Sequence, residues 1–378
     1  MQAEWLPEAS STTRIGTAIV RTTSLNPHVV TLGTAGGPRW WTGANAGKRA
    51  GISTAVVVGD AVYLVDAGTG VGNQLMKAGY SVASLRGIFL THLHSDHCID
   101  LASLAIFGLF TLRHDQKPIR IIGPGDRGAL PPNSPRAVVA PTPIFPEQPT
   151  PGTTAMFEHL MRAYGADLND RVIDALRPSP LDRFVASDIE IPDDIGYDPN
   201  SNPTPTGMIP FEIYRDELVT VTATLVEHPP IAPAFAFRFD TAEGSVTISG
   251  DTAPCENLVR LAHDTDLLLH EAIDFDWVSR AYGSAATEEA QASMDHHRRS
   301  HTSAPDAIAL ADKAGATRLA LHHLVPGTTP TAVWLSHANA YSGTFLVPDD
   351  LDVIPFSTVM RKEADSVSHT TLEMTSSL

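Results

Sequence analysis

The sequence is poor in positive charge. Its 378 residues carry 26 Lys and Arg against 43 Asp and Glu, a formal net charge of −17, and no lysine lies between Lys117 and Lys313. Non-specific binding to nucleic-acid backbones depends on Lys and Arg. The composition therefore makes a nucleic-acid substrate unlikely, without excluding one that a local group of arginines binds.

Long apolar runs and cysteines are also missing. No run of about 18 apolar residues exists, so no membrane span is expected. Residues 1–16 show no basic region followed by an apolar one, so no secretory signal is visible and a cytoplasmic protein is expected, or a periplasmic or secreted one if a signal has been removed. The two cysteines, Cys98 and Cys255, are too few for a disulfide framework and fit a reducing compartment. We expect two small buried thiols, with a single bridge between loops as the alternative.

What is present is an alternation of strand and helix patterns, which is typical of α/β layering. β-Branched, apolar runs separated by turn residues predict strands, and helical spacing with a glycine stop predicts helices. The predicted strands are 28–34, 53–59, 61–68, 86–92, 118–125, 217–228, 234–240, 244–251, 266–272 and 317–323. The predicted helices are 71–79, 97–113 and 304–314.

Residues 126–215 interrupt this alternation. Positions 131–210 hold 15 of the 29 prolines, and 126–215 carry seven Arg, no Lys and 13 Asp or Glu, with helical stretches only near 155–164 and 167–176. Proline is largely excluded from sheet interiors. We expect one domain, 1–378, with an inserted segment outside the sheet that acts as a lid. Its apolar side chains predict that the lid encloses a small, partly apolar ligand: Phe145, Met156, Phe157, Leu160 and Tyr164.

Histidines and carboxylates gather at the ends of the predicted strands. The stretch FLTHLHSDHCID, residues 89–100, packs three histidines and an aspartate into six positions, although the whole chain has 16 histidines. Polar groups also end the strands TATLVEH (222–228), VTISGD (246–251), LLLHEA (267–272) and RLALHH (318–323). In α/β folds this edge holds the ligands, and buried charges and imidazoles are costly unless they are paired or coordinated. One or two metal ions would compensate them. Imidazole and carboxylate donors suit zinc, and manganese or iron also fits such ligands.

These motifs resemble the metallo-β-lactamase superfamily, and their order resembles its ribonuclease Z and arylsulfatase-like branch. The matching pieces lie within residues 28–323: LGTAGGP, YLVDAGTG, FLTHLHSDH, TATLVEHP, ISGDTAPC, LLLHEA, SHTS and LALHH. The resemblance implies an αββα sandwich with a dinuclear metal site.

Carried over by position, the resemblance implies a role for each residue of these motifs. His92, His94 and His228 would hold one metal, Asp96, His97 and His323 the second, and Asp251 would bridge the two. RLALHH leaves His322 as an alternative to His323. Asp96, Glu271 and His301 are the expected catalytic residues, with His301 delivering a proton to the leaving group, and Asp66 would brace the metal loop. His296 and His297 are expected to be solvated.

The expected function is a dinuclear zinc hydrolase that uses a metal-bound hydroxide on a small-molecule ester, lactone, sulfate ester or phosphodiester. The alternative is a ribonuclease Z-type endonuclease that processes the 3′ end of a tRNA precursor, and a metal-bound scaffold without activity is a third reading. The inserted segment shows no equivalent of the glycine- and proline-containing arm that grips tRNA in that family. Trp40 and Trp41 either line a pocket for an organic substrate or pack a loop. The sequence leaves the assembly open, with a homodimer as one candidate.

Overall fold

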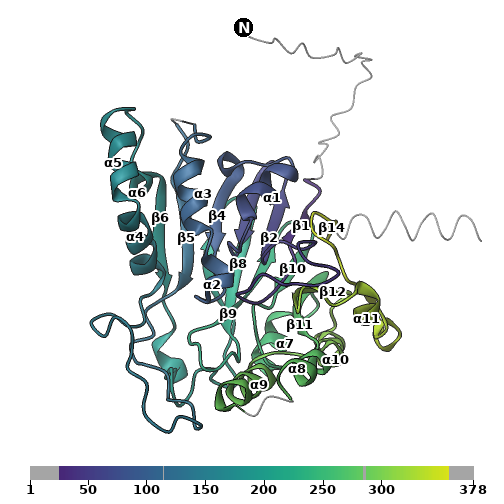
Figure 1. The fold of residues 1–378 in the computed structure, drawn as a ribbon. Coiled ribbons are helices and arrows are strands. Elements are labelled where there is room, and N and C mark those ends of the chain that lie inside the picture. Colours follow the sequence, from purple (N-terminus) through teal and green to yellow (C-terminus); the bar gives the residue numbers. More distant parts are fainter. Residues whose placement is uncertain (1–24, 114, 284–286, 357–378) are drawn as a thin grey trace, which may run out of the picture.

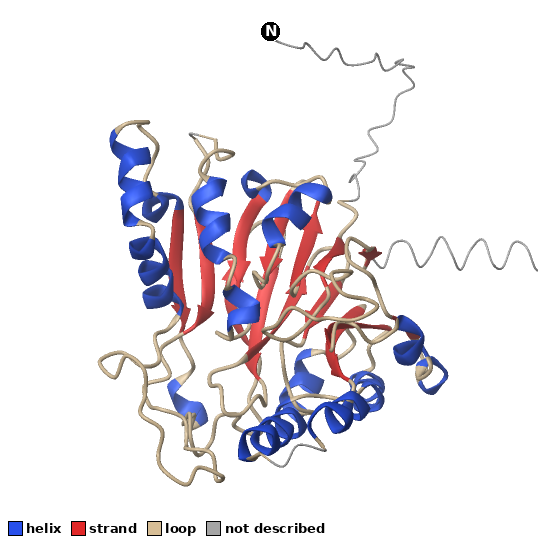
Figure 2. Ribbon diagram, in the orientation of Figure 1, coloured by secondary structure: helices blue, strands red, loops and turns tan. Residues whose placement is uncertain are grey.

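The fold is built on two facing β-sheets of seven strands each (Figures 1 and 2). The computed structural model describes residues 25–113, 115–283 and 287–356, so the N-terminal stretch searched for a signal lies outside it. The first sheet has the order β14 (Val353–Pro355), β1 (His28–Gly33), β2 (Ser53–Val58), β3 (Ala61–Val65), β4 (Leu85–Phe89), β5 (Ile119–Pro124) and β6 (Phe184–Ile189). The second has the order β13 (Thr344–Leu346), β12 (Arg318–Val325), β11 (Leu267–Ile273), β10 (Ser245–Ile248), β9 (Phe235–Asp240), β8 (Thr220–Leu225) and β7 (Phe211–Arg215).

Helices cover the outer faces of the two sheets. Apolar side chains of α1 (Val71–Lys77), α3 (Leu101–Gly108) and α4 (Thr153–Ala163) pack on the first sheet. The second sheet is covered by α7 (Glu256–Leu261) and α10 (Ala304–Ala314). A third apolar cluster, rich in Phe and Val, fills the space between the sheets. The predicted αββα sandwich is confirmed.

The remaining helices range from four to 13 residues in length. They are α2 (Ser95–Cys98), α5 (Gly165–Ile173), α6 (Pro180–Arg183), α8 (Phe275–Tyr282), α9 (Glu288–Ser300) and α11 (Thr331–Leu335), with single 3-10 turns at Val82–Ser84, Asp193–Ile195 and Ala338–Ala340. The predicted helix at 97–113 is in fact α2 and α3, separated at residues 99–100. No helix in the described parts of the chain has both the length and the apolar character needed to cross a bilayer.

Strand direction brings the predicted polar positions to one edge. Strands β3 to β6 run parallel to one another, as do β10 to β13, and β8 is antiparallel to β9, which is antiparallel to β10. The carboxyl ends of β3 and β4, and those of β8, β10, β11 and β12, therefore open onto a common side of the sandwich. Ligand sites of layered α/β folds are found at such edges.

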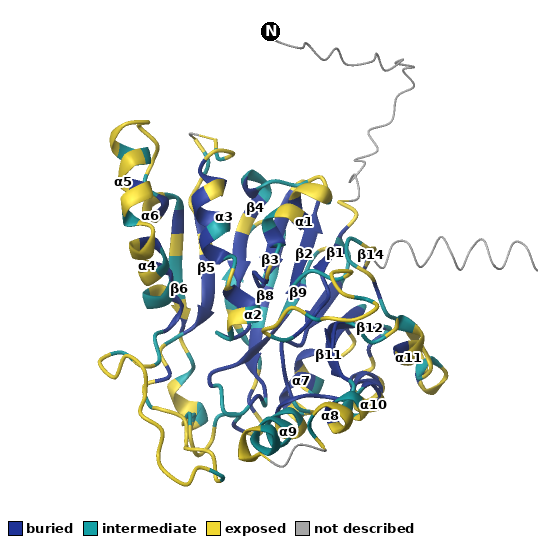
Figure 3. Cartoon of the chain, viewed as in Figure 1, coloured by how far each residue is buried: buried dark blue, intermediate teal, exposed yellow. Residues whose placement is uncertain are grey.

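The proline-rich insertion is only partly outside the sheet, so this prediction was wrong for its middle. β6 pairs in parallel with β5 from Phe184 to Ile189 and extends the first sheet. Phe157 and Met161 of α4 are buried against the same sheet. The segments without regular structure, mainly 126–152 and 190–210, form the exposed loops at one end of the molecule (Figure 3). A lid role for these loops stays a prediction.

Candidate metal centre

Three imidazole nitrogens converge at the carboxyl ends of β4 and β8. His92 follows β4, His94 precedes α2, and His228 follows β8. His92 Nε2 lies 3.0 Å from His94 Nδ1, which lies 3.3 Å from His228 Nε2. The three nitrogens can hold one metal ion.

A second group of donors lies beside the first. His97 Nε2 is 3.2 Å from His323 Nε2 and 3.6 Å from Asp96 Oδ2, and His323 Nε2 is 3.4 Å from the same oxygen. Asp251 Oδ1 completes this group, at 3.3 Å from His97 Nε2 and 3.2 Å from His323 Nε2. His323 therefore belongs to the group, whereas His322 of the same strand is in none of the donor groups of the described residues.

Asp251 faces both groups. Its Oδ1 lies in the second group, while its Oδ2 is 3.8 Å from His228 Nε2 of the first. The side chain is buried, and Oδ1 has no hydrogen-bond partner among the described residues. A tetrahedral zinc ion with bonds of about 2.0–2.1 Å would separate its ligand atoms by roughly 3.3 Å. The observed spacings of 3.0–3.6 Å fit that geometry, so these residues suit a pair of metal ions.

Hydrogen bonds orient the rings that present these nitrogens. Asp66, at the end of β3, accepts hydrogen bonds from the Thr91 backbone N–H at 2.8 Å and from His97 Nδ1 at 2.8 Å. His228 Nδ1 donates to the Ser300 carbonyl at 2.8 Å. In these two rings a proton on Nδ1 leaves Nε2, the nitrogen that faces the donor groups, with the lone pair that a metal ion would bind. Asp66 braces the loop backbone as the sequence suggested.

The loop after β1 packs tightly against the second donor group. A Cβ built on Gly36 would lie 2.3 Å from Cε1 of the His323 ring, so only glycine fits there. Gly37 has a φ of +92°, a conformation that favours glycine, and its backbone N–H donates to Asp96 Oδ2 at 2.9 Å. The two glycines thus let the main chain contact two of the predicted ligands.

The electrostatics of the first group favour neutral, ligating imidazoles. Burial, followed by the charges of neighbouring imidazoles, lowers the pKa of His92 well below its usual value. Burial also lowers the pKa values of His94 and His228. For His97 burial alone would lower the pKa, but the carboxylates of Asp251, Asp66 and Asp96 outweigh it and raise the pKa well above the usual value. Neutral imidazole is the form that binds a metal ion, so the rings of the first group are ready to bind, whereas a metal ion in the second group would replace the proton that the carboxylates favour on His97.

Glu271 and His301 form the predicted pair next to the metal ligands. His301 Nδ1 donates to Glu271 Oε1 at 3.0 Å and lies 3.9 Å from Asp251 Oδ2. The Glu271 oxygen also accepts the backbone N–H of Thr252 at 3.0 Å. Burial lowers the pKa of His301, but Glu271 and the nearby aspartates outweigh it and raise the pKa to about 9. The structure thus brings all the predicted site residues together.

Two histidines expected to be solvated instead face the site. The α9 residues His296 and His297 are half-buried, and their ring centroids lie 5.9 and 5.8 Å from that of His301. His296 also lies 6.2 Å from the His228 ring. His301 follows α9 with an extended backbone, so its spacing of four from His297 is not that of one helical face, and helical periodicity does not point to these contacts.

The cysteines behave as free thiols. Cys98 is buried and donates to the His94 carbonyl at 3.1 Å, whereas Cys255 is half-buried. Burial raises the pKa of Cys98 to about 12. Both cysteines are free as predicted, but only Cys98 is fully buried, and the alternative bridge is not formed.

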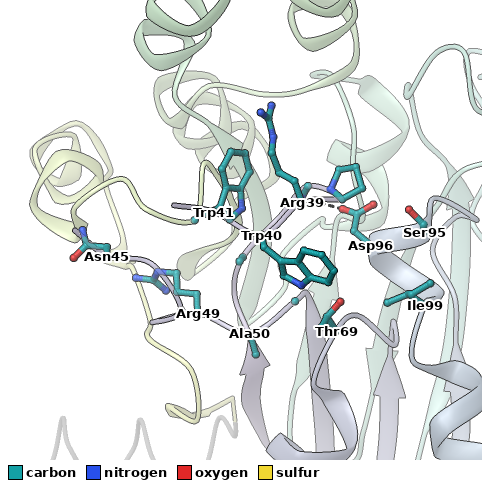
Figure 4. A pocket seen from close by; sticks show the side chains of 16 residues that line it. Arg39, Trp40, Trp41, Asn45, Arg49, Ala50, Thr69, Ser95, Asp96 and Ile99 are labelled. Carbon is teal, nitrogen blue, oxygen red and sulfur yellow. Dashed lines mark hydrogen bonds between the residues drawn. The ribbon is translucent and has the colours of Figure 1, made fainter. Parts of the chain in front are cut away.

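A cavity of about 340 Å³ adjoins Asp96 (Figure 4). Both tryptophans of the GGPRWW stretch line it, and the Trp40 side chain is 90% exposed. Trp41 is half-buried and packs edge-on against Trp277 with ring centroids 5.4 Å apart. Trp41 therefore packs its loop, whereas an organic substrate in the cavity that Trp40 lines stays a prediction.

Comparisons with known proteins agree with this geometry. The model of the metallo-beta-lactamase superfamily matches residues 47–161. A ribonuclease Z of Mycobacterium sp. (strain KMS) is 30% identical over 310 residues, which cover 80% of this chain and 89% of that protein. A ribonuclease Z of Mycobacterium tuberculosis (strain H37Rv) is 28% identical over 309 residues, covering 80% and 90%. Human tRNase Z, short form, shares the fold with a TM-score of 0.55 at 19% identity, over 87% of this chain and 99% of that one. These relatives indicate a hydrolase, and the chain belongs to the metallo-beta-lactamase superfamily, in the branch that includes ribonuclease Z.

Proposed function

We propose that the protein is a zinc-dependent phosphodiester hydrolase of the ribonuclease Z type, which cuts tRNA precursors near their 3′ end. The observation that carries this proposal is the pair of donor groups that share Asp251, with ligand spacings that suit two metal ions. The similarity to proteins named ribonuclease Z, over 80% of the chain, moves this alternative ahead of the small-molecule reading.

In this proposal His92, His94 and His228 would hold one zinc ion, Asp96, His97 and His323 would hold the other, and Asp251, which faces both donor groups, would serve both. Bound zinc would supply Lewis acidity and lower the pKa of a coordinated water toward about 7. The two aspartates leave part of the charge of two zinc ions uncompensated. The centre is therefore suited to an anionic substrate even though the protein is acidic overall.

His301 would hold the proton for the leaving oxygen. Glu271 accepts from Nδ1 and so fixes the ring, which lies beside those of His228 and His323 with centroid distances of 5.0 and 6.2 Å. The carboxylate of Glu271, which accepts the hydrogen bond from the ring, raises the pKa of His301 and so favours its protonated form. Glu271 acts through His301 and is a positioning residue.

The test is an assay with a tRNA precursor that carries a 3′ trailer, using zinc-loaded protein. We expect a single cut near the 3′ end, and a rate lower by about 10²–10⁴-fold in His301→Ala, because general acid catalysis contributes that much. Zinc content, measured in parallel, should be unchanged in this variant. A precursor left intact under conditions in which esters or lactones are hydrolysed would reject the proposal.

A small-molecule hydrolase is the second candidate, favoured by the net charge of −17 and by the cavity at Asp96. It predicts turnover of one member of a panel of chromogenic esters, lactones, sulfate esters and phosphodiesters, and loss of that turnover on addition of a chelator. The likeness to arylsulfatases is part of this reading and stays a prediction.

A further inference from the structure

Arg39 is held in place by aromatic side chains at the rim of the cavity. Its guanidinium carbon lies 4.7 Å from the centroid of Trp41 and 5.3 Å from that of Trp277, and Nη2 donates to the Tyr282 hydroxyl at 2.5 Å. Figure 4 shows Arg39 and Trp41 running to one side of the loop and Trp40 to the other. Each contact of a cation with an aromatic face contributes about 0.5–1 kcal/mol at an exposed site. The position of the guanidinium is therefore fixed before any ligand arrives.

The Arg39 guanidinium forms no ion pair with a carboxylate of the described residues. The structure gives Arg39 no ion pair within residues 25–113, 115–283 and 287–356, in a chain with 43 Asp and Glu. Two other arginines near the site are paired: Arg280 of α8 with Asp274 at 3.4 Å and Arg136 with Asp295 at 2.8 Å. The charge of Arg39 is thus available to an anion from outside.

His297 lies on the same aromatic pair and connects it to the catalytic residues. Its ring centroid is 6.2 Å from Trp277, 5.6 Å from Tyr282 and 5.8 Å from His301. Its Nδ1 is buried without a hydrogen-bond partner among the described residues. Burial lowers the pKa of His297 to about 4, so the ring is a neutral donor.

The loop that carries Arg39 is fastened to the metal ligands. Trp41 Nε1 donates to the Gly36 carbonyl at 3.0 Å, Gly36 packs on the His323 ring, and the Gly37 N–H donates to Asp96. A displacement of Arg39 relative to the metal centre would therefore disturb several contacts at once. The guanidinium and the centre form one rigid arrangement.

We propose that Arg39 and His297 form an anion subsite, which binds a phosphate group next to the phosphodiester held at the metal centre. A guanidinium matches phosphate with two parallel hydrogen bonds, and a neutral imidazole adds one donor. This inference rests on the proposed function, because only a substrate with neighbouring phosphates would use both places. The subsite gives a reason why Arg39 is held by aromatic side chains and has no ion pair among the described residues, although the protein is acidic.

The test compares the binding of adenosine 5′-monophosphate and adenosine 3′,5′-bisphosphate to zinc-loaded protein by calorimetry. We expect the bisphosphate to bind the wild type at least about tenfold more tightly, the value of one hydrogen bond to a charged group. Arg39→Gln should remove this advantage. Arg39→Lys should restore it only in part, because an ammonium cannot make the two parallel bonds. His297→Gln should reduce it.

Arg280→Gln is the matched control, since it removes a neighbouring positive charge that is already paired. This variant should keep the bisphosphate advantage, which separates the subsite from a general effect of charge. Equal binding of the two nucleotides to the wild type, no binding of either, or an advantage that survives in Arg39→Gln would each overturn the inference. A protein that shows the advantage but leaves tRNA precursors uncut would refute the proposed function and support the subsite.

Discussion

At the scale of single residues, Asp66 shows how a side chain that touches no metal can govern the centre. It is buried, has a φ of +61°, and joins the Thr91 backbone to the His97 ring. The His97 nitrogen on the far side of that ring belongs to the second donor group. Asp66 therefore sets both the path of the loop and the tautomer of a predicted ligand.

Replacing Asp66 with Asn should weaken zinc binding by about 10–100-fold, the usual effect of losing a partner of a metal ligand. Asparagine also tolerates positive φ, so the backbone is preserved while one of the two acceptor oxygens becomes a donor. Competition with a chromogenic chelator would measure the affinity. Asp60→Asn, in the exposed turn between β2 and β3, is the control, and an Asp66→Asn affinity equal to that of the control would contradict this role.

The placement of the site residues could largely be predicted from the sequence, because the ligands follow apolar strands whose ends share an edge. His92, His94, Asp96 and His97 are also close in sequence, so short loops bring them together. The role of His296 and His297 could not be predicted, since their burial depends on α8 and the loop after β1 packing beside α9. Pairing of Arg39 with Trp277 is likewise a contact between distant segments.

At the scale of elements, the inserted segment 126–215 contains regular structure that its overall proline content does not predict. No proline lies between Pro151 and Pro178, and α4 and α5 occupy that interval; none lies in 184–189, where β6 forms. The proline content averaged over residues 131–210 therefore conceals two proline-free stretches. One forms helices whose apolar side chains pack on the first sheet, and the other forms a strand of that sheet. One of the remaining loops contacts α9, the helix that carries His296 and His297. Arg136 of this loop donates to Asp295 and Gln291 of α9 at 2.8 and 2.7 Å.

Phe157→Ala should therefore destabilise the whole domain. Phe157 of α4 is buried in the cluster on the first sheet, and truncating such a side chain costs about 3–5 kcal/mol. Phe145→Ala, in the 70% exposed loop position, should change the free energy of unfolding by no more than about 0.5 kcal/mol. Urea unfolding would measure both. If Phe157→Ala matched Phe145→Ala, α4 would not be part of the core.

A second element-scale contact joins the two sheets and gives a pH dependence. Tyr63 of β3 and Tyr214 of β7 both donate to Asp216 Oδ2, at 2.7 and 3.0 Å. Burial raises the pKa of Asp216, but the Tyr63 hydrogen bond and the backbone N–H groups of Leu218 and Val219 outweigh it, so the pKa lies below its usual value. The stabilisation is therefore present above the unfolded pKa of about 3.9 and is lost as the pH falls through the folded value.

Asp216→Asn should then lower the free energy of unfolding at pH 7 by about 1–3 kcal/mol, since hydrogen bonds to a charged group are replaced by weaker ones. The difference from the wild type should shrink as the pH falls below about 4. Urea unfolding at a series of pH values would measure it, with Asp60→Asn as the exposed control. A difference that stayed constant down to acid pH would mean that the charge of Asp216 contributes nothing.

At the scale of the whole molecule, the predicted ligands come from both halves of the sandwich. His92, His94, Asp96 and His97 follow β4 of the first sheet, whereas the others lie on or after strands of the second: His228, Asp251 and His323. Ions that bind all of them would join the two sheets at one edge. The apolar cluster between the sheets already joins them elsewhere, so metal would add to the stability of a sandwich that forms without it.

Removal of metal should therefore lower Tm without abolishing the fold. Ions that bind only the folded state stabilise it by about 4 kcal/mol when their free concentration is 1,000 times Kd. Thermal unfolding with zinc and after dialysis against a chelator would measure the shift. Asp251→Ala should show a much smaller shift, because both donor groups lose a member, while Asp60→Asn should keep it. Equal Tm values with and without zinc in the wild type would mean that the seven side chains do not bind metal together, and the dinuclear centre would have to be abandoned.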